Sequence, residues 1–443
     1  MLTSLKNKLI ILLVILIMAF GLYLYFRPTT PTNQTLINQS DRADTLFPVG
    51  TTTSPTSATT TVDNGGILGA IGQTISNLFN ASSSAVNNSN LVISKRLPMS
   101  ISGFFLTKEG GIPFMYFMEK ATGHVAKINL QNDSMEIVSN TTLPGVEETY
   151  WGVDGTNLRL IARYLKNEWD IESLSGSIPL NLPPVKQTST TTASSSNDRP
   201  LKSLVLDSRT YAFAVSPGGE RIFSLNYSPT EGSTGLISDF GFKNPQKVFT
   251  NPLTEWLPTW ITPNIITLQI KSSGMAEGFL FSLNLTTGSF NKILGNIKGF
   301  TALPGTNLGK VAYSGSGDAF KLKVIETATG KISNYNLQTL PEKCVWATDA
   351  VKLYCAVPVS LPANTLLPDS WYSGEVVFTD NIWLINTKTG ETSRLYKQGD
   401  SSDVGSFDAI DLRLDSQGKI LYFRNKNDST LWSLKFGENS FIP

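Results

Sequence analysis

The stretch NIWLINTKTGETSRLY, residues 381–396, holds two runs of alternating apolar and polar residues joined by a Thr-Lys-Thr-Gly turn. Alternation with a period of two is typical of β-strands that bury one face, and glycine tolerates the positive φ that such a turn needs. The stretch therefore predicts a β-hairpin. Similar hairpins recur in GFLFSLNLTTGSFNKIL (278–294), AFKLKVIETATGKISNYNL (319–337) and HVAKINLQNDSMEIV (124–138).

A second kind of hairpin alternates with the first, most clearly in YAFAVSPGGERIFSLNY (211–227). One hairpin of each kind makes a four-stranded unit, and units begin near residues 102, 149, 211, 257, 299, 344 and 407. Self-similarity at this period in an all-β chain is typical of propeller blades. We therefore expect an all-β fold, a seven-bladed β-propeller of four-stranded antiparallel blades, over residues 90–443.

The last unit lacks an outermost strand, whereas NLVISKRL (90–97) precedes the first unit with nothing to pair with. We expect this N-terminal strand to complete the last blade and close the ring, because closure removes two open sheet edges. Turns of the first kind of hairpin are expected at one set of glycines: Gly123, at or near Gly176 and Gly241, then Gly288, Gly330, Gly390 and Gly437.

Two turns of the second kind, SPGGERIF (216–223) and DSQGKILYF (415–423), resemble the Ser-Pro-Asp-Gly-Lys-x-Ile-x-Phe signature of TolB-type and WD-repeat-like β-propellers. The family's aspartate is replaced by Gly218 in one copy and by Gln417 in the other. The resemblance implies a propeller used mainly for binding, often in protein assemblies. It carries no catalytic residues over to this chain.

The N-terminus contains LIILLVILIMAFGLYLYF, residues 9–26, without a charge. As a helix it spans roughly 27 Å, close to the hydrocarbon thickness of a bilayer. We expect a cytoplasmic basic head (1–8), a single-pass transmembrane anchor (9–26) in the cell membrane, and an extracytoplasmic remainder. A cleaved signal peptide is the alternative, but bulky residues follow where a peptidase requires small ones.

Residues 27–89 are rich in Thr, Ser and Pro and poor in large apolar side chains. Such a segment buries too little surface to offset its ordering entropy, so we expect a disordered, flexible stalk. Two insertions interrupt the repeat further on, at 183–200 and at 358–380. The second contains Trp371 and Tyr372.

Aromatic residues in loops are candidates for a binding surface, and we select Trp371, Tyr372 and Trp256. For Trp151, Trp260 and Trp346 we favour packing in the core. The loops that enter the inner strands also carry the carboxylates of Glu147, Glu148, Asp403 and Asp408. These are either solvated loop acids or, as the sharper alternative, a cation site or an acid/base pair.

Cys344 and Cys355 are the two cysteines of the chain, and CVWATDAVKLYC places them opposite each other in one hairpin. Opposed residues of an antiparallel pair come close enough for a disulfide, which is the pairing that we expect. Two reduced, buried thiols are the alternative. Without nearby histidine, two cysteines make an incomplete zinc site.

The net charge of +1 gives no electrostatic reason to bind nucleic acid. The sole histidine, His124, follows a turn, which weighs against histidine-based catalysis. We therefore expect no catalytic residues, no metal and no cofactor. The expected function is a membrane-anchored binding or scaffold module for a protein or a cell-envelope polymer, and not an enzyme. The alternatives are a propeller enzyme that acts on glycans or peptides with acidic loop residues, and a purely structural component.

Overall fold

The computed structural model describes residues 91–167, 170–180, 199–400 and 404–436. The chain divides into two compact units, Met1–Asn64 and Gly65–Pro443, and every described residue belongs to the second. The predicted head (1–8), anchor (9–26) and stalk (27–89), together with most of the insertion at 183–200, lie outside the described residues.

The predicted single-pass location in a membrane is corrected at this point. Within the described ranges, no helix is long and apolar enough to cross a membrane. The α-helix of these ranges, α3 (Asp369–Tyr372), has four residues, whereas a membrane span needs about 20. The described residues therefore give no support to the predicted single-pass anchor.

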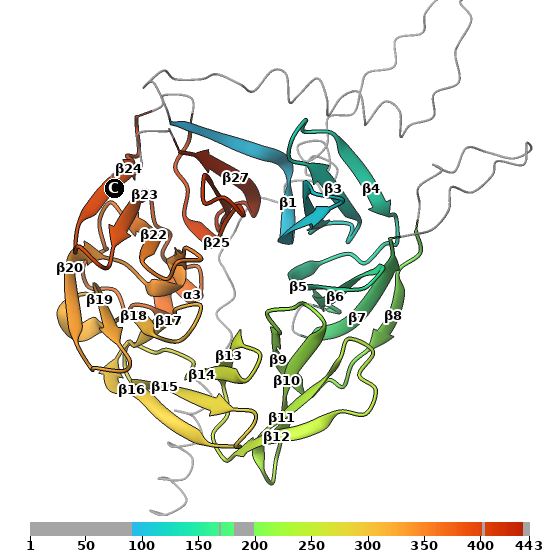
Figure 1. Ribbon diagram of the computed structural model, residues 1–443, viewed down its shortest axis with the longest axis horizontal. Coiled ribbons are helices and arrows are strands. Elements are labelled where there is room, and N and C mark those ends of the chain that lie inside the picture. Colours follow the sequence, from blue (N-terminus) through green and yellow to red (C-terminus); the bar gives the residue numbers. More distant parts are fainter. Residues whose placement is uncertain (1–90, 168–169, 181–198, 401–403, 437–443) are drawn as a thin grey trace, which may run out of the picture. The chain divides into compact units, whose positions relative to one another are not determined.

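The described residues form antiparallel sheets in which each strand pairs with the next along the chain (Figure 1). Figure 1 shows the sheets following one another round a ring, with the first strand of each sheet nearest the centre. This arrangement confirms the prediction of an all-β propeller built from four-stranded antiparallel sheets.

Five sheets have four strands each. The first consists of β5 (Val146–Asp154), β6 (Asn157–Leu165), β7 (Ile171–Pro179) and β8 (Lys202–Val205), and the second of β9 (Thr210–Val215), β10 (Arg221–Ser228), β11 (Gly232–Asp239) and β12 (Gln246–Asn251). The third consists of β13 (Trp256–Thr262), β14 (Ile265–Ile270), β15 (Glu277–Asn284) and β16 (Phe290–Lys298), and the fourth of β17 (Thr301–Pro304), β18 (Lys310–Ser314), β19 (Lys321–Glu326) and β20 (Ile332–Gln338). The fifth consists of β21 (Cys344–Trp346), β22 (Lys352–Pro358), β23 (Asp380–Asn386) and β24 (Thr392–Tyr396).

The remaining sheet has seven strands and joins the two ends of the described chain. Its order is β25 (Ala409–Leu414), β26 (Ile420–Asn425), β27 (Thr430–Lys435), β1 (Val92–Glu109), β2 (Ile112–Glu119), β3 (Val125–Asn129) and β4 (Met135–Ser139). The long strand β1 serves both halves: Val92 to Lys95 pair with β27, and Ile101 to Glu109 pair with β2. One strand is therefore the fourth strand beside β25–β27 and the first strand beside β2–β4.

The glycine turns have local causes. Gly390 has a φ of 84°, and the side-chain oxygen of Asn386 accepts hydrogen bonds from the backbone N–H groups of Lys388 and Thr389 at 3.0 and 3.2 Å. Gly288 and Gly330 each have a φ of 72°. These turns are confirmed, because glycine has no Cβ to oppose a positive φ. The turn expected at or near Gly176 is not at that residue, which lies within β7, and the strand ends at Pro179.

Apolar side chains fill the space between neighbouring sheets. One cluster joins the sheet of β9–β12 to that of β13–β16, and in it the ring of Phe249 lies edge-on against Trp256, with centroids 6.0 Å apart. Another joins Phe407 and Trp432 to Tyr354 of the preceding sheet. Burial of this kind, at roughly 25 cal/mol per Å² of apolar surface, provides the main attraction between sheets.

A close approach of two backbones fixes the distance between β5 and the turn after β9. The Val153 N–H donates a hydrogen bond to the carbonyl oxygen of Gly219 at 3.1 Å. A Cβ added to Gly152 would lie 2.2 Å from that same oxygen. This position therefore has no room for any side chain.

We predict that Gly152→Ala lowers the free energy of unfolding by about 1–3 kcal/mol, because the added methyl forces the two backbones apart. Urea denaturation of the purified chain measures the change. Gly218→Ala is the matched control, because a Cβ there meets nothing within 4 Å. Equal stability of the two variants would contradict the prediction.

Candidate functional site

A cavity of about 640 Å³ lies against the inner strands. Its walls come from the inner strands β1, β5, β9, β13 and β25, from the turn after β9 and from Arg424 of β26. The five inner strands lie nearest the centre of the ring in Figure 1. The volume falls within the range of small-molecule and cofactor pockets. The aromatic part of the wall consists of Phe104, Phe105, Tyr150, Trp151, Phe213 and Trp260.

A β-bulge in β25 shapes the charged part of the wall. Ile410 lies opposite Arg424, but Arg413 lies opposite Tyr422, so β25 contains one residue more than its partner at this point. Asp411 takes up the extra length with a φ of 52°, an uncommon value for a residue other than glycine. Bulges re-aim side chains, and here Asp411 and Arg413 both line the cavity.

Most charged groups at the cavity already have partners. Arg424 donates hydrogen bonds to Asp411, with 2.8 Å from Nε to Oδ2. Glu148 accepts hydrogen bonds from Arg163 at 2.9 Å and from the Tyr150 hydroxyl at 2.8 Å. Burial and the adjacent Glu148 carboxylate raise the pKa of Tyr150 well above its usual range, so this hydroxyl stays protonated and donating.

Arg413 differs from these groups. It is exposed to the cavity, and among the described residues it forms no salt bridge and no side-chain hydrogen bond. Its guanidinium lies over the ring of Phe104, 5.4 Å from the centroid. Sequence reasoning missed this residue because Arg413 has no motif around it, and its direction depends on the bulge at Asp411.

A second polar group, the buried ion cluster of Lys343, Asp380 and Asp408, lies where the sheet of β21–β24 meets the sheet of β25. All three side chains are fully buried, and Lys343 forms salt bridges to both carboxylates, at 2.9 Å to Asp380. The Asp380 carboxylate also accepts the Ala409 N–H at 2.7 Å. The cluster thus joins three segments: Lys343 directly precedes β21, Asp380 begins β23, and Asp408 directly precedes β25.

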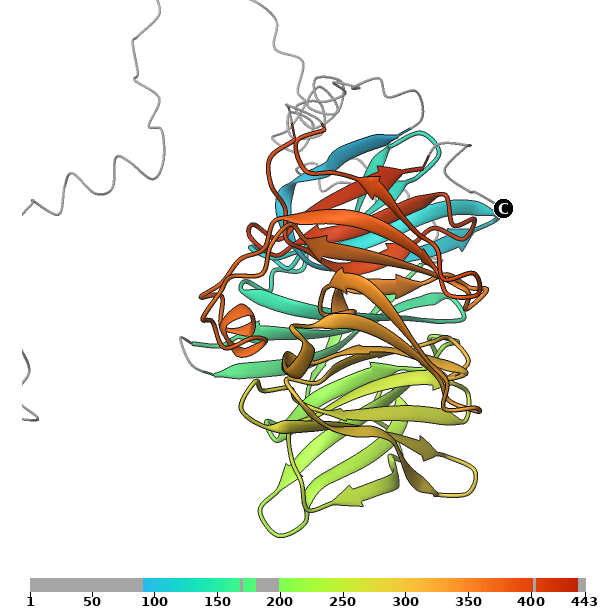
Figure 2. The ribbon, with the colours of Figure 1, turned by 90° about the vertical axis from the view of Figure 1, so that its left-hand side faces the viewer.

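The predicted insertion lies between β22 and β23, as expected, and covers this cluster. Trp371 is 3% exposed, and its indole N–H donates to Asp408 at 2.8 Å. Its ring stacks against Phe378, with 5.8 Å between centroids. Asp369 accepts the N–H of Gly274, from the loop after β14, at 2.6 Å. Figure 2 shows α3, which contains Trp371, at one face of the ring.

The structure places the predicted surface aromatics differently from one another. Trp371 is buried over the ion cluster, and Trp256 is 1% exposed between two sheets, where its indole N–H donates to the Leu253 carbonyl at 3.0 Å. The predicted exposure of these two side chains is corrected, because each indole covers apolar surface of an adjacent element. Tyr372 is half-buried, and its hydroxyl donates to Glu342 at 2.5 Å.

The four predicted carboxylates are not brought together in one group. Glu147 pairs with Lys120 at 2.7 Å, Glu148 pairs with Arg163 beside the cavity, and Asp408 belongs to the buried ion cluster. Asp403 lies outside the described residues. Among the described residues, Glu148 is the one of the four that lines the cavity.

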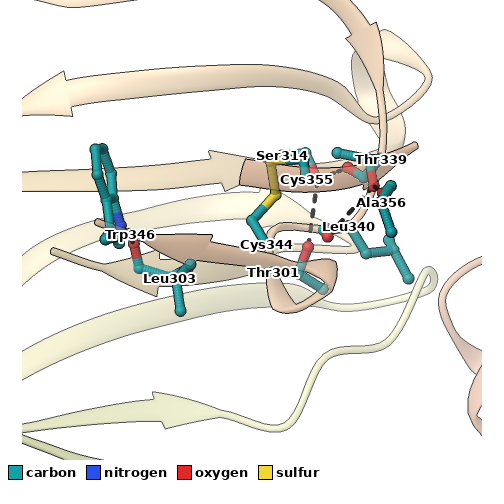
Figure 3. The surroundings of a disulfide bond; sticks show 9 residues. All are labelled: Thr301, Leu303, Ser314, Thr339, Leu340, Cys344, Trp346, Cys355 and Ala356. Carbon is teal, nitrogen blue, oxygen red and sulfur yellow. Dashed lines mark hydrogen bonds between the residues drawn. A yellow bond between two sulfur atoms is a disulfide. The ribbon is translucent and has the colours of Figure 1, made fainter. Parts of the chain in front are cut away.

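The predicted disulfide between Cys344 and Cys355 is present, which confirms the pairing (Figure 3). The two residues face each other across β21 and β22, with 4.0 Å between Cα atoms. Both are buried, and Figure 3 shows Ser314, Thr339 and Ala356 around them. Thr339 donates to the Ala356 carbonyl at 2.7 Å, which links this hairpin to the preceding sheet.

Comparisons with known proteins find no matching family model and no matching curated protein. Similar solved structures include an oligogalacturonate lyase in complex with manganese, 9% identical over 77% of this chain and 97% of that one, with a TM-score of 0.47. A puromycin hydrolase mutant is 12% identical over 77% of this chain and 53% of that one, with a TM-score of 0.44. TolB from Acinetobacter baumannii is 9% identical over 79% and 81%, with a TM-score of 0.35. The expected resemblance to TolB-type propellers is thus found among solved structures.

These neighbours correct one prediction. The sequence led us to expect a protein that is not an enzyme, whereas the similar structures include a lyase, a hydrolase and a structure from a study of prolyl endopeptidases. These likenesses concern the fold alone, and the expectation that the protein is not an enzyme is withdrawn.

We predict that removing the disulfide by Cys344→Ala together with Cys355→Ala lowers the free energy of unfolding by about 3 kcal/mol. The bridge closes a loop with a sequence separation of 11, and loop closure of that length restricts the unfolded chain by about this amount. Urea denaturation measures the loss. Alkylation of the denatured, unreduced chain should label no cysteine, and labelling of both would show that the bridge is absent.

We further predict a pH dependence that arises from Asp380. Burial raises the pKa of Asp380 to about 6 against the opposing effect of Lys343, and its Oδ1 atom has no hydrogen-bond partner among the described residues. The folded state therefore holds this proton more tightly than the unfolded state, so the contribution of Asp380 to stability falls as the pH rises from about 4 to about 6.

Urea denaturation of the wild-type chain and of Asp380→Asn at about pH 4 and about pH 7.5 tests this sign. Relative to the variant, the wild-type chain should lose roughly 3 kcal/mol between the two pH values, since each pKa unit corresponds to about 1.36 kcal/mol. A difference between the two proteins that does not change with pH would contradict the prediction.

Proposed function

We propose that this protein is a seven-bladed β-propeller whose function is to bind a segment of a partner protein in the cavity along its inner strands. Residues 90–443 form the propeller domain in this proposal, and β1 completes the last blade. The observation that carries the proposal is the cavity itself, of about 640 Å³ and lined from five inner strands.

The composition of the wall supports a binding role. Tryptophan, tyrosine and arginine dominate the energetics of protein interfaces, and the wall contains Trp151, Trp260, Tyr150 and Arg413. The side chains are also held in place: Tyr150 is hydrogen-bonded to Glu148, and Ser102 is hydrogen-bonded to Thr149 at 2.6 Å. A wall that is already ordered loses little conformational entropy when a ligand binds.

The insertion contributes indirectly in this proposal. Because Trp371 and Phe378 are part of a core cluster with Phe320 and Leu340, the insertion acts as a fixed cover for one part of the ring. Of the predicted binding surface, Glu148 remains as a proposed contact residue in the cavity, whereas Tyr372 and Glu147 lie outside its lining.

Site-specific photo-crosslinking tests the proposal. A benzophenone amino acid is introduced in place of Thr259, which is exposed and lines the cavity, in the full chain expressed in its own cells. We expect a covalent adduct with one partner protein after irradiation. The matched control is the same amino acid at Thr250, which is exposed on the outermost strand β12.

An adduct at Thr259 that is absent at Thr250 supports the proposal. No protein adduct at Thr259, or the same adducts at both positions, would overturn it.

A further inference from the structure

Among the described residues that line the cavity, one charged group forms no salt bridge, and it is positive. Four charged side chains line the cavity in the described residues: Glu148, Asp411, Arg413 and Arg424. Glu148 is neutralised by Arg163 and Asp411 by Arg424, which leaves the guanidinium of Arg413.

Arg413 is also held in a fixed direction. The bulge at Asp411 places it in the cavity, and its guanidinium lies over the Phe104 ring. Stacking on an aromatic ring leaves the N–H edge of a guanidinium free, and this planar edge matches a carboxylate with two parallel hydrogen bonds.

The other polar groups of the wall narrow the class of ligand. The Ser102 and Thr149 hydroxyls bond to each other, and the Tyr150 hydroxyl is committed to Glu148. The buried indole N–H groups of Trp151 and Trp260 have no acceptor among the described residues. Beyond these groups, the wall offers aromatic surface, the cation of Arg413 and the hydroxyl groups of Thr107, Ser216 and Thr259. A carboxylate-bearing ligand with apolar side chains matches the cation and the aromatic surface together.

We infer that the cavity binds an acidic peptide segment, in which a carboxylate pairs with Arg413 and neighbouring apolar side chains contact the aromatic wall. This inference rests on the proposed function, because it names the chemistry of the ligand in the same cavity. Arg413 is the residue that selects the carboxylate, and Phe104 positions its guanidinium.

Fluorescence anisotropy tests the inference with three labelled peptides of equal length, which alternate leucine with glutamate, glutamine or lysine. The full chain should bind the glutamate peptide at least about tenfold more tightly than the glutamine peptide, because a charge-assisted, bidentate pair contributes about that factor. The lysine peptide should bind most weakly of the three.

Arg413→Gln should abolish the preference for the glutamate peptide over the glutamine peptide. Arg413→Lys should keep part of that preference, because lysine is charged but cannot form the bidentate pair. The matched control is Arg394→Gln. Arg394 is exposed on the outermost strand β24, and its guanidinium lies 5.8 Å from the centroid of Trp383. This control should bind the glutamate peptide as the wild-type chain does.

Equal affinity of the wild-type chain for the glutamate and glutamine peptides would overturn the inference. The same loss of affinity for the glutamate peptide in Arg413→Gln and Arg394→Gln would also overturn it. A second result would also overturn the inference, in favour of an acidic glycan. In that result, an oligosaccharide of uronic acids displaces the labelled peptides, and the protein shows no preference among the three peptides. Thermal denaturation of each variant checks that the fold is kept.

The crosslinking experiment separates this inference from the function on which it rests. A partner adduct at Thr259 whose yield falls about tenfold in Arg413→Gln supports both. An adduct whose yield is unchanged in Arg413→Gln leaves the proposed binding function intact and overturns the role of Arg413.

Discussion

The double pairing of β1 is the constraint on which the rest of the structure depends. Its first part pairs with β27 near the end of the chain, and its second part pairs with β2. Without this strand, β27 and β2 would each present an open edge, and open edges invite pairing with other chains. The ends of the described chain are therefore held together by backbone hydrogen bonds rather than by side chains alone.

This closure also assembles the cavity. Phe104 lies on the second part of β1, and Arg413 lies on β25, three strands away in the same sheet. The contact joins the inner strand β25 to the inner part of β1, which follows the part of β1 that pairs with β27. At the opposite side of β25, the buried ion cluster fixes the neighbouring sheet of β21–β24 through Lys343. Removing one partner of such a buried pair typically costs about 3–5 kcal/mol, because an uncompensated charge remains.

Features that depend on residues close together in the chain could be predicted from the sequence. The turns at Gly288, Gly330 and Gly390 and the disulfide between Cys344 and Cys355 follow from residues close together in the chain. Sheet type and strand order followed from the repeat. Each of these features depends on interactions within one or two hairpins, where turn residues and period-two alternation determine the register.

The site depended on contacts that the sequence does not display. Trp256 and Trp371 lie in segments that read as loops, yet neighbouring sheets and the ion cluster bury them. Arg413 reaches the cavity through a bulge in which Asp411, not glycine, adopts a positive φ. Glycine would have signalled such a bulge, whereas aspartate in an alternating strand gives no sign of it.

The pairing of β1 with β27 is tested most directly by a new disulfide. Ser94 lies opposite Ser433 in the ladder, and their hydroxyl oxygens are 3.2 Å apart. In the double variant Ser94→Cys with Ser433→Cys, mild oxidation should join the two new cysteines. Peptide mapping should then find one segment from each end of the chain in a single linked peptide. Two new thiols that label freely in the native protein, with no such peptide, would contradict the closure.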